Sequence, residues 1–155
     1  MNFDFEQIVQ NLQKGSYIYL GAGSGRRVFD LGNGYVVKVA KNRKGIAQNK
    51  AEHSISQRKD SPVFAKIPKV SENYDLLIME KADSLLLFSD VLRYFKVNSY
   101  RELFQLKEFR YMTKELGLLE ADLRRTRNWG KISGRPVIID YGFTIRVRNN
   151  YYFPF

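Results

Sequence analysis

The first third of the chain changes from a helical to a strand-like spacing of apolar residues. Apolar positions share one helical face over 4–14, which predicts an amphipathic helix with Asp4 and Gln7 as its capping box and Gly15 at its end. Three short strands are predicted after it: 17–20, 27–31 and 35–40. Asn33-Gly34 is predicted to form a two-residue hairpin turn, so this part is expected to be an antiparallel meander.

The remaining chain mixes helices with short strands. A helix is predicted from about 46 to 58, and a second capping box, Ser99 with Glu102, begins a long helix that ends at Gly117. Strands are predicted at four places: 65–70, 76–80, 130–132 and 136–139. The run 76–80 is nearly all apolar, which is typical of a central strand. A polar loop is predicted at 120–128, and an aromatic, basic tail at 143–155.

Composition narrows the class of protein. The 155 residues suffice for one domain, and no apolar run is long enough to span a bilayer. The N-terminus carries acids early, which predicts that it is not a signal peptide. Cysteine is absent, which excludes disulfides and suits a cytoplasmic location, and the single histidine, His53, excludes a site of several imidazoles. The net charge of +10 fits nucleic acid, phosphate or an acidic protein as a partner, or a merely solvated surface.

The glycine-rich stretch around residue 23 carries the first chemical signal. A P-loop needs Lys-Ser/Thr and then a helix after its last glycine, and a dinucleotide fingerprint also needs a helix there. Here Gly25 is followed by Arg26-Arg27 and a predicted strand, so both alternatives fail. A glycine loop between two strands, with Lys38 on the third strand, is the arrangement that covers a nucleotide in kinases.

Further elements of a phosphoryl-transfer site follow in order. Glu52, the only acid between Lys38 and Asp60, is expected to hold the lysine in place, or else to be a surface glutamate. In LLIMEKAD, Met79 is expected to border the pocket, and Glu80 to Ala82 to form a linker that meets a base.

Two polar motifs complete the predicted site. In ADLRRTRNWG, Asp122 would orient an attacking hydroxyl, Arg124 would neutralise the transferred phosphate, and Asn128 would bind a metal. In VIIDYG, Asp140 follows an apolar strand and could bind Mg²⁺ that bridges nucleotide phosphates.

Taken together, residues 17–145 resemble the protein-kinase-like superfamily in a minimal form similar to compact bacterial and phage proteins. The motifs that carry the resemblance are GAGSGRRVF, VVKVA, DLRRTRN and DYG. The resemblance implies an α+β fold with an antiparallel N-lobe at about 1–80, a reduced helical C-lobe at about 84–155, and ATP with Mg²⁺ between them. It implies a nucleotide site made of Gly21, Gly23, Gly25, Val28, Lys38, Glu52, Met79, Glu80 and Ala82.

Four departures from the family pattern leave the function open. Arg26 stands where the third loop glycine is expected, Glu120 replaces the usual histidine, and five residues instead of four separate Asp122 from Asn128. Only thirteen residues follow Gly142, so a groove for peptide substrates is not expected. An active phosphotransferase and an inactive pseudokinase that binds a partner protein are both compatible with this pattern. Arg26 and Arg27 could face phosphates or solvent.

A nucleic-acid-binding protein is a third interpretation, because basic residues precede an aromatic tail. The residues concerned are Arg124, Arg125, Arg127, Lys131, Arg135, Tyr151, Tyr152, Phe153 and Phe155.

Overall fold

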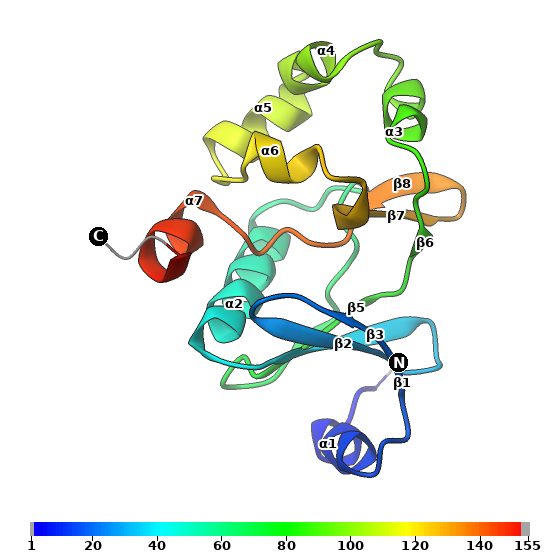
Figure 1. Ribbon diagram of the computed structural model, residues 1–155, viewed down its shortest axis with the longest axis vertical. Helices are drawn as coiled ribbons and strands as arrows, with labels where there is room; N and C mark the ends of the chain where they lie inside the picture. The colour runs from blue at the N-terminus through cyan, green and yellow to red at the C-terminus, as the bar shows by residue number, and fades with distance from the viewer. Residues whose placement is uncertain (1, 153–155) are drawn as a thin grey trace.

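A five-stranded antiparallel sheet forms the N-terminal half of the computed structural model, which describes residues 2–152 (Figure 1). Its order is β1-β2-β3-β5-β4. The strands are β1 Ile18–Ala22, β2 Arg26–Asp30, β3 Tyr35–Ala40, β4 Lys69–Val70 and β5 Leu76–Glu80. The predicted bounds of β3 and β5 are confirmed, and those of β1 and β2 differ by one or two residues.

Two details of the predicted sheet are wrong. The predicted strand 65–70 pairs only at Lys69–Val70, because Pro68 has no N–H for a ladder, and Ala65 instead donates its N–H to the carbonyl of Ile138 at 3.0 Å. The turn between β2 and β3 is longer than two residues. The N–H of Leu31 donates to the carbonyl of Tyr35 at 3.0 Å, which leaves 32–34 as a three-residue loop with positive φ at both of its glycines.

Helix α1, Phe5–Gln13, packs on one face of this sheet. The carboxylate of Asp4 accepts hydrogen bonds from the N–H groups of Glu6 and Gln7 and so caps the helix. The side chain of Gln7, the other member of the predicted capping box, donates to Asn11 Oδ1 at 3.1 Å instead. Ile8 of the helix packs in one cluster with Val37 and Ile78 of the sheet. Because side chains alternate along a strand, the neighbours of Val37 and Ile78 project to the opposite face.

Helix α2, Arg43–Arg58, lies beside β3 on the C-terminal side of the sheet (Figure 1). It begins earlier than the predicted start at residue 46, because the side chain of Asn42 accepts a hydrogen bond from the N–H of Gly45 at 3.1 Å. Gly45 therefore lies inside the first turn. A Cβ atom there would overlap the carbonyl oxygen of Gly25, so the glycine lets α2 contact the backbone of the glycine-rich loop.

Four short helices lie between β6 and β7 in the chain: α3 Ser89–Tyr94, α4 Tyr100–Gln105, α5 Lys107–Lys114 and α6 Glu120–Leu123. The single long helix predicted up to Gly117 is wrong, because the backbone is extended at Leu106, with ψ 140°, and divides α4 from α5. The predicted cap is confirmed, since Ser99 Oγ accepts from the N–H of Glu102. The segment 120–128 is not a loop, because it contains α6 and the 3₁₀ turn η1 Thr126–Asn128.

A three-stranded sheet connects these helices to the last part of the chain. Its strands are β6 Asp83–Ser84, β7 Trp129–Ile132 and β8 Arg135–Ile138. Ser133 and Gly134 form the turn between β7 and β8, with positive φ at both residues. The predicted tail forms α7 Ile145–Val147 and the π-helical turn η2 Arg148–Tyr152, while Phe153 and Phe155 lie outside the described residues.

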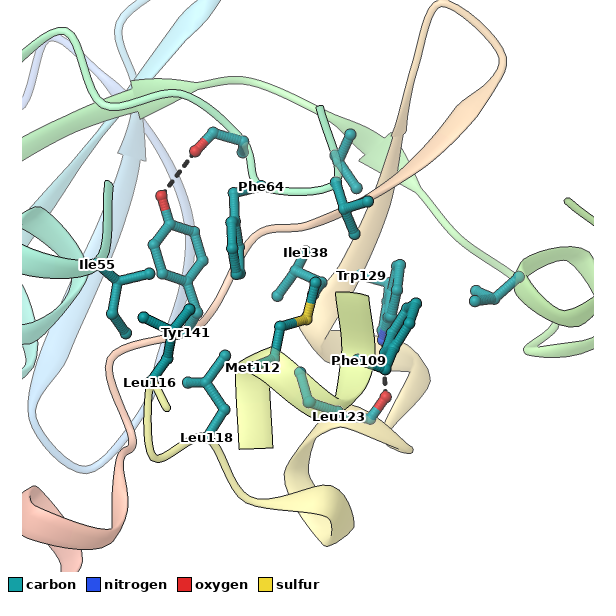
Figure 2. Packing of buried hydrophobic residues seen from close by; sticks show 14 of the residues in the cluster. Ile55, Phe64, Phe109, Met112, Leu116, Leu118, Leu123, Trp129, Ile138 and Tyr141 are labelled. Atoms are coloured by element: carbon teal, nitrogen blue, oxygen red, sulfur yellow. Dashed lines mark hydrogen bonds between the residues drawn. The ribbon is translucent and has the colours of Figure 1, made fainter. Parts of the chain in front are cut away.

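The larger hydrophobic core lies between the helices, β7 and β8 (Figure 2). Trp129 is 1% exposed, stacks on Phe109, and donates its indole N–H to the carbonyl of Leu123 at 2.8 Å. Tyr141 packs against Phe64 and donates its hydroxyl to the carbonyl of Ala65 at 2.7 Å. The buried tyrosine thus fixes the chain directly after Asp140. None of the described helices is long and apolar enough to cross a membrane.

Candidate active site

A cavity of about 830 Å³ lies between the five-stranded sheet and the segments 122–128 and 139–143. It brings together ten of the residues predicted from the sequence. They are Gly21, Gly23, Val28, Lys38, Met79, Glu80, Ala82, Asp122, Asn128 and Asp140. Three others, Gly25, Glu52 and Arg124, do not line it.

The sheet supplies one wall of the cavity through its two-residue periodicity. Val36 and Lys38 project from the same face of β3, opposite to the face that packs on α1. Val28 and Met79 complete an apolar surface beside them. Strand β1 ends at the glycine-rich loop, and Gly21 and Gly23 line the cavity there.

Lys38 forms a buried ion pair with Glu52 of α2. Its ammonium nitrogen lies 3.0 Å from each carboxylate oxygen and also donates to the carbonyl of Ile139 at 2.6 Å. Burial lowers the pKa of Lys38 and the charge of Arg26 lowers it further, while Glu52 and Asp140 oppose this shift. Glu52 is 0% exposed and does not line the cavity, so it positions the lysine from the protein interior.

Arg26 takes part in the same cluster. It is 6% exposed and donates to both oxygens of Glu52, at 2.6 and 3.2 Å, and to Asp140 Oδ1 at 3.0 Å. A third hydrogen-bond partner is Asn49 Oδ1, at 3.0 Å. Arg27 points the other way and is exposed. The alternation along β2 provides the signal for this difference, because Arg26 lies two residues before Val28 and shares its face.

The charges of Arg26 and Lys38 keep Glu52 ionised. Burial alone would raise the pKa of Glu52, but these two cations and the hydrogen bonds from Arg26 and the N–H of Tyr141 lower it from 4.5 to about 2. Four segments, β2, β3, α2 and the chain directly after β8, are therefore joined through one carboxylate.

Asp122 and Asp140 form the facing wall. Burial raises the pKa of Asp122, and the charge of Asp140 raises it further, while Arg125 and Arg127 act in the opposite direction. The side-chain amide of Asn128 donates to the carbonyl of Asp122 at 2.9 Å. The η1 turn accommodates the extra residue between Asp122 and Asn128, so both reach the cavity.

The structure corrects the position of Arg124. Its guanidinium lies 4.2 Å from the centre of the Tyr100 ring of α4, outside the cavity. Leu123 is buried in the core, and Arg124, the next residue, ends α6 with its side chain directed toward α4. Arg125 and Arg127, which the sequence did not single out for catalysis, line the cavity instead.

Gly25 also differs from the prediction. It lies against the first turns of α2, where a Cβ atom would come within 2.9 Å of the N–H nitrogen of Gly45. Its carbonyl accepts a hydrogen bond from the N–H of Lys41 at 2.7 Å. Gly25 therefore anchors the glycine-rich loop against α2 and does not line the cavity.

The basic stretch predicted for nucleic acid is divided among separate environments. Lys131 pairs with Asp90 at 3.3 Å, and Arg135 donates to the carbonyl of Ile132 within its own hairpin. Arg124 stacks on Tyr100, whereas Arg125 and Arg127 line the cavity. The basic residues of this stretch therefore do not all face one site.

A metal ion would need ligands from a bound molecule. Within residues 2–152, no three His, Cys, Asp or Glu side chains are grouped so that they could hold a metal. Asp140 and the amide oxygen of Asn128 are oxygen donors of the kind that Mg²⁺ prefers, and both line the cavity. This donor set fits Mg²⁺ only when substrate phosphates complete its coordination.

The fold of this chain is similar to that of a solved structure. A ternary complex of APH(2")-IIa with streptomycin and ATP is structurally similar, with a TM-score of 0.50 and 17% sequence identity, over 92% of this chain and 71% of that chain. That protein is an aminoglycoside phosphotransferase with a protein-kinase-like fold. The chain described here accordingly has a reduced protein-kinase-like α+β fold. No protein-family model and no curated protein sequence matches it.

Proposed function

We propose that the cavity binds ATP and that the protein transfers the γ-phosphate of ATP to a hydroxyl acceptor. The observation that carries this proposal is the buried Lys38–Glu52 pair, which presents an ammonium group to a cavity whose facing wall carries Asp122, Asn128 and Asp140. Phosphoryl transfer requires mainly positioning and charge stabilisation, and these residues supply both.

The apolar part of the cavity suits the adenine base. Val28, Val36 and Met79 would contact its faces and edge. The linker N–H of Glu80 already donates to Lys66, and that of Lys81 to Gly34, both at 2.9 Å. We therefore assign the N–H of Ala82 as the donor to the base.

The polar part of the cavity suits the phosphates. Lys38 would contact them under the backbone of Gly21 and Gly23, and Asp140 with Asn128 would hold a Mg²⁺ ion carried by the nucleotide. Such an ion polarises the phosphate oxygens. Asp122 would accept a hydrogen bond from the acceptor hydroxyl, and its raised pKa favours the accompanying proton transfer. The acceptor is a small hydroxyl compound, another protein or the protein itself.

Binding and transfer are tested separately. Mg-ATP should raise the Tm of the wild-type protein, and γ-labelled ATP should give a labelled product, first with the protein alone and then with added hydroxyl compounds. Asp140→Ala should abolish transfer, whereas Asp60→Ala, which changes a 92% exposed aspartate, should leave it unchanged. A Tm increase without transfer to any acceptor would favour the inactive pseudokinase. No response of the Tm to nucleotide would refute the assignment of the site.

A further inference from the structure

Arg26 is an additional cation inside the proposed phosphate site. Its guanidinium reaches from β2 to Glu52 of α2 and to Asp140 after β8, with all three contacts between 2.6 and 3.2 Å. The arginine lines the cavity although only 6% of it is exposed. It is therefore held rigidly, beside the carboxylate that would meet a metal ion carried by the nucleotide.

The charge balance of this cluster is unusual for a metal site. The two positive charges of Arg26 and Lys38 balance the two negative charges of Glu52 and Asp140. Without Arg26 the cluster would carry a surplus negative charge that attracts a divalent cation. With Arg26 present this surplus is cancelled, and Asp140 Oδ1 already accepts a charge-assisted hydrogen bond.

Basic side chains also line the rest of the cavity. Lys81, Arg125 and Arg127 also line it, so its wall has five basic side chains against four acidic ones. A nucleotide that enters with its negative phosphates meets fixed positive groups directly.

We propose that Arg26 serves as a built-in counter-charge for the nucleotide phosphates, so that ATP binds without a divalent cation. This inference rests on the proposed function, because it requires ATP to be the ligand. A Mg²⁺ ion carried by the nucleotide would still meet Asp140 and Asn128, but the affinity for ATP does not depend on it.

The test compares the Kd for ATP, measured by calorimetry, in Mg²⁺ and in EDTA. For the wild type we expect the two values to agree within about threefold, and for Arg26→Gln we expect EDTA to weaken binding at least tenfold, or about 1.4 kcal/mol. Arg26→Lys keeps the cation and should remain resistant to EDTA. Arg27→Gln makes the same change in charge at the exposed neighbour and should behave as the wild type.

The outcomes separate the two proposals. Wild-type binding that requires Mg²⁺ would overturn the role of Arg26 and leave the ATP site intact. Absence of binding under both conditions would overturn the ATP site and, with it, this inference. The wild-type comparison alone decides between these results, so a failure of Arg26→Gln to fold does not prevent the test.

Discussion

The backbone N–H of Tyr141 donates a hydrogen bond to Glu52 Oε2 at 2.8 Å, across 89 positions of sequence. The same carboxylate binds Lys38 and Arg26, so β2, β3, α2 and the segment after β8 meet at one side chain. The position of the lysine in the cavity and the attachment of the two halves of the molecule therefore depend on the same group.

The pKa of Glu52 predicts an acid-sensitive stability. Folding lowers this pKa from 4.5 to about 2, so the ionised carboxylate stabilises the protein above pH 4.5, and the stabilisation is lost as the pH falls from 4.5 toward 2. The shift corresponds to about 3 kcal/mol, or a decrease in Tm of about 10 °C. Calorimetric scans across this range measure it, and Glu72→Gln, at an exposed position, should show the same decrease. A Tm that stays constant over the range would contradict the assignment.

Substitutions of Lys38 and of Glu52 should lower the free energy of unfolding by different amounts. Glu52→Gln leaves two buried cations without their shared carboxylate, and we expect a loss of about 3–5 kcal/mol in urea unfolding. In Lys38→Met the carboxylate keeps Arg26, so we expect a loss below about 2 kcal/mol, together with at least tenfold weaker ATP binding. Equal destabilisation by the two substitutions would mean that Arg26 does not compensate Glu52.

Substitution of Asp122 should reduce phosphate transfer more than it weakens ATP binding. Asp122→Asn removes the proton acceptor but keeps the shape of the side chain, so we expect transfer to fall by about 10²-fold or more with little change in the Kd for ATP. Arg124→Gln is the matched control from the same segment, because Arg124 stacks on Tyr100 outside the cavity. If Arg124→Gln reduced transfer as strongly, the placement of the two residues would be wrong.

Gly45 should resist substitution although it lies in a helix. Alanine usually stabilises a helix interior by about 1 kcal/mol relative to glycine. Here the added methyl group would overlap the carbonyl of Gly25, so we expect Gly45→Ala to destabilise the protein by about 1–3 kcal/mol. Gly23→Ala, where a Cβ meets nothing within 4 Å, should leave the Tm nearly unchanged. An increase in the Tm of Gly45→Ala would refute the close contact between the loop and α2.

The sequence predicted the parts of the fold that local patterns determine. The bounds of β3 and β5 follow from alternating and continuous apolar residues, and Lys38 and Asp140 are readily located beside such strands. The break at Leu106 has no proline or glycine to mark it and depends on how α4 and α5 pack. The position of Arg124 depends on the burial of Leu123, which only the tertiary structure reveals. The ion pairs of Arg26 join residues up to 114 positions apart, beyond the reach of a local pattern.

The sequence distance between Arg26 and Asp140 also bears on the order in which the protein folds. Arg26, Lys38 and Glu52 lie within one stretch of chain and pair through a short loop closure, whereas Asp140 and Tyr141 close a loop of about a hundred residues, which costs more entropy. We expect the segment after β8 to dock last, so that Asp140→Asn accelerates unfolding and leaves the refolding rate nearly unchanged. Stopped-flow fluorescence of Trp129, the single tryptophan, measures both rates, and slower refolding of the variant would show that docking occurs early. The cavity between the five-stranded sheet and the segments 122–128 and 139–143 is then the last part of the molecule to form.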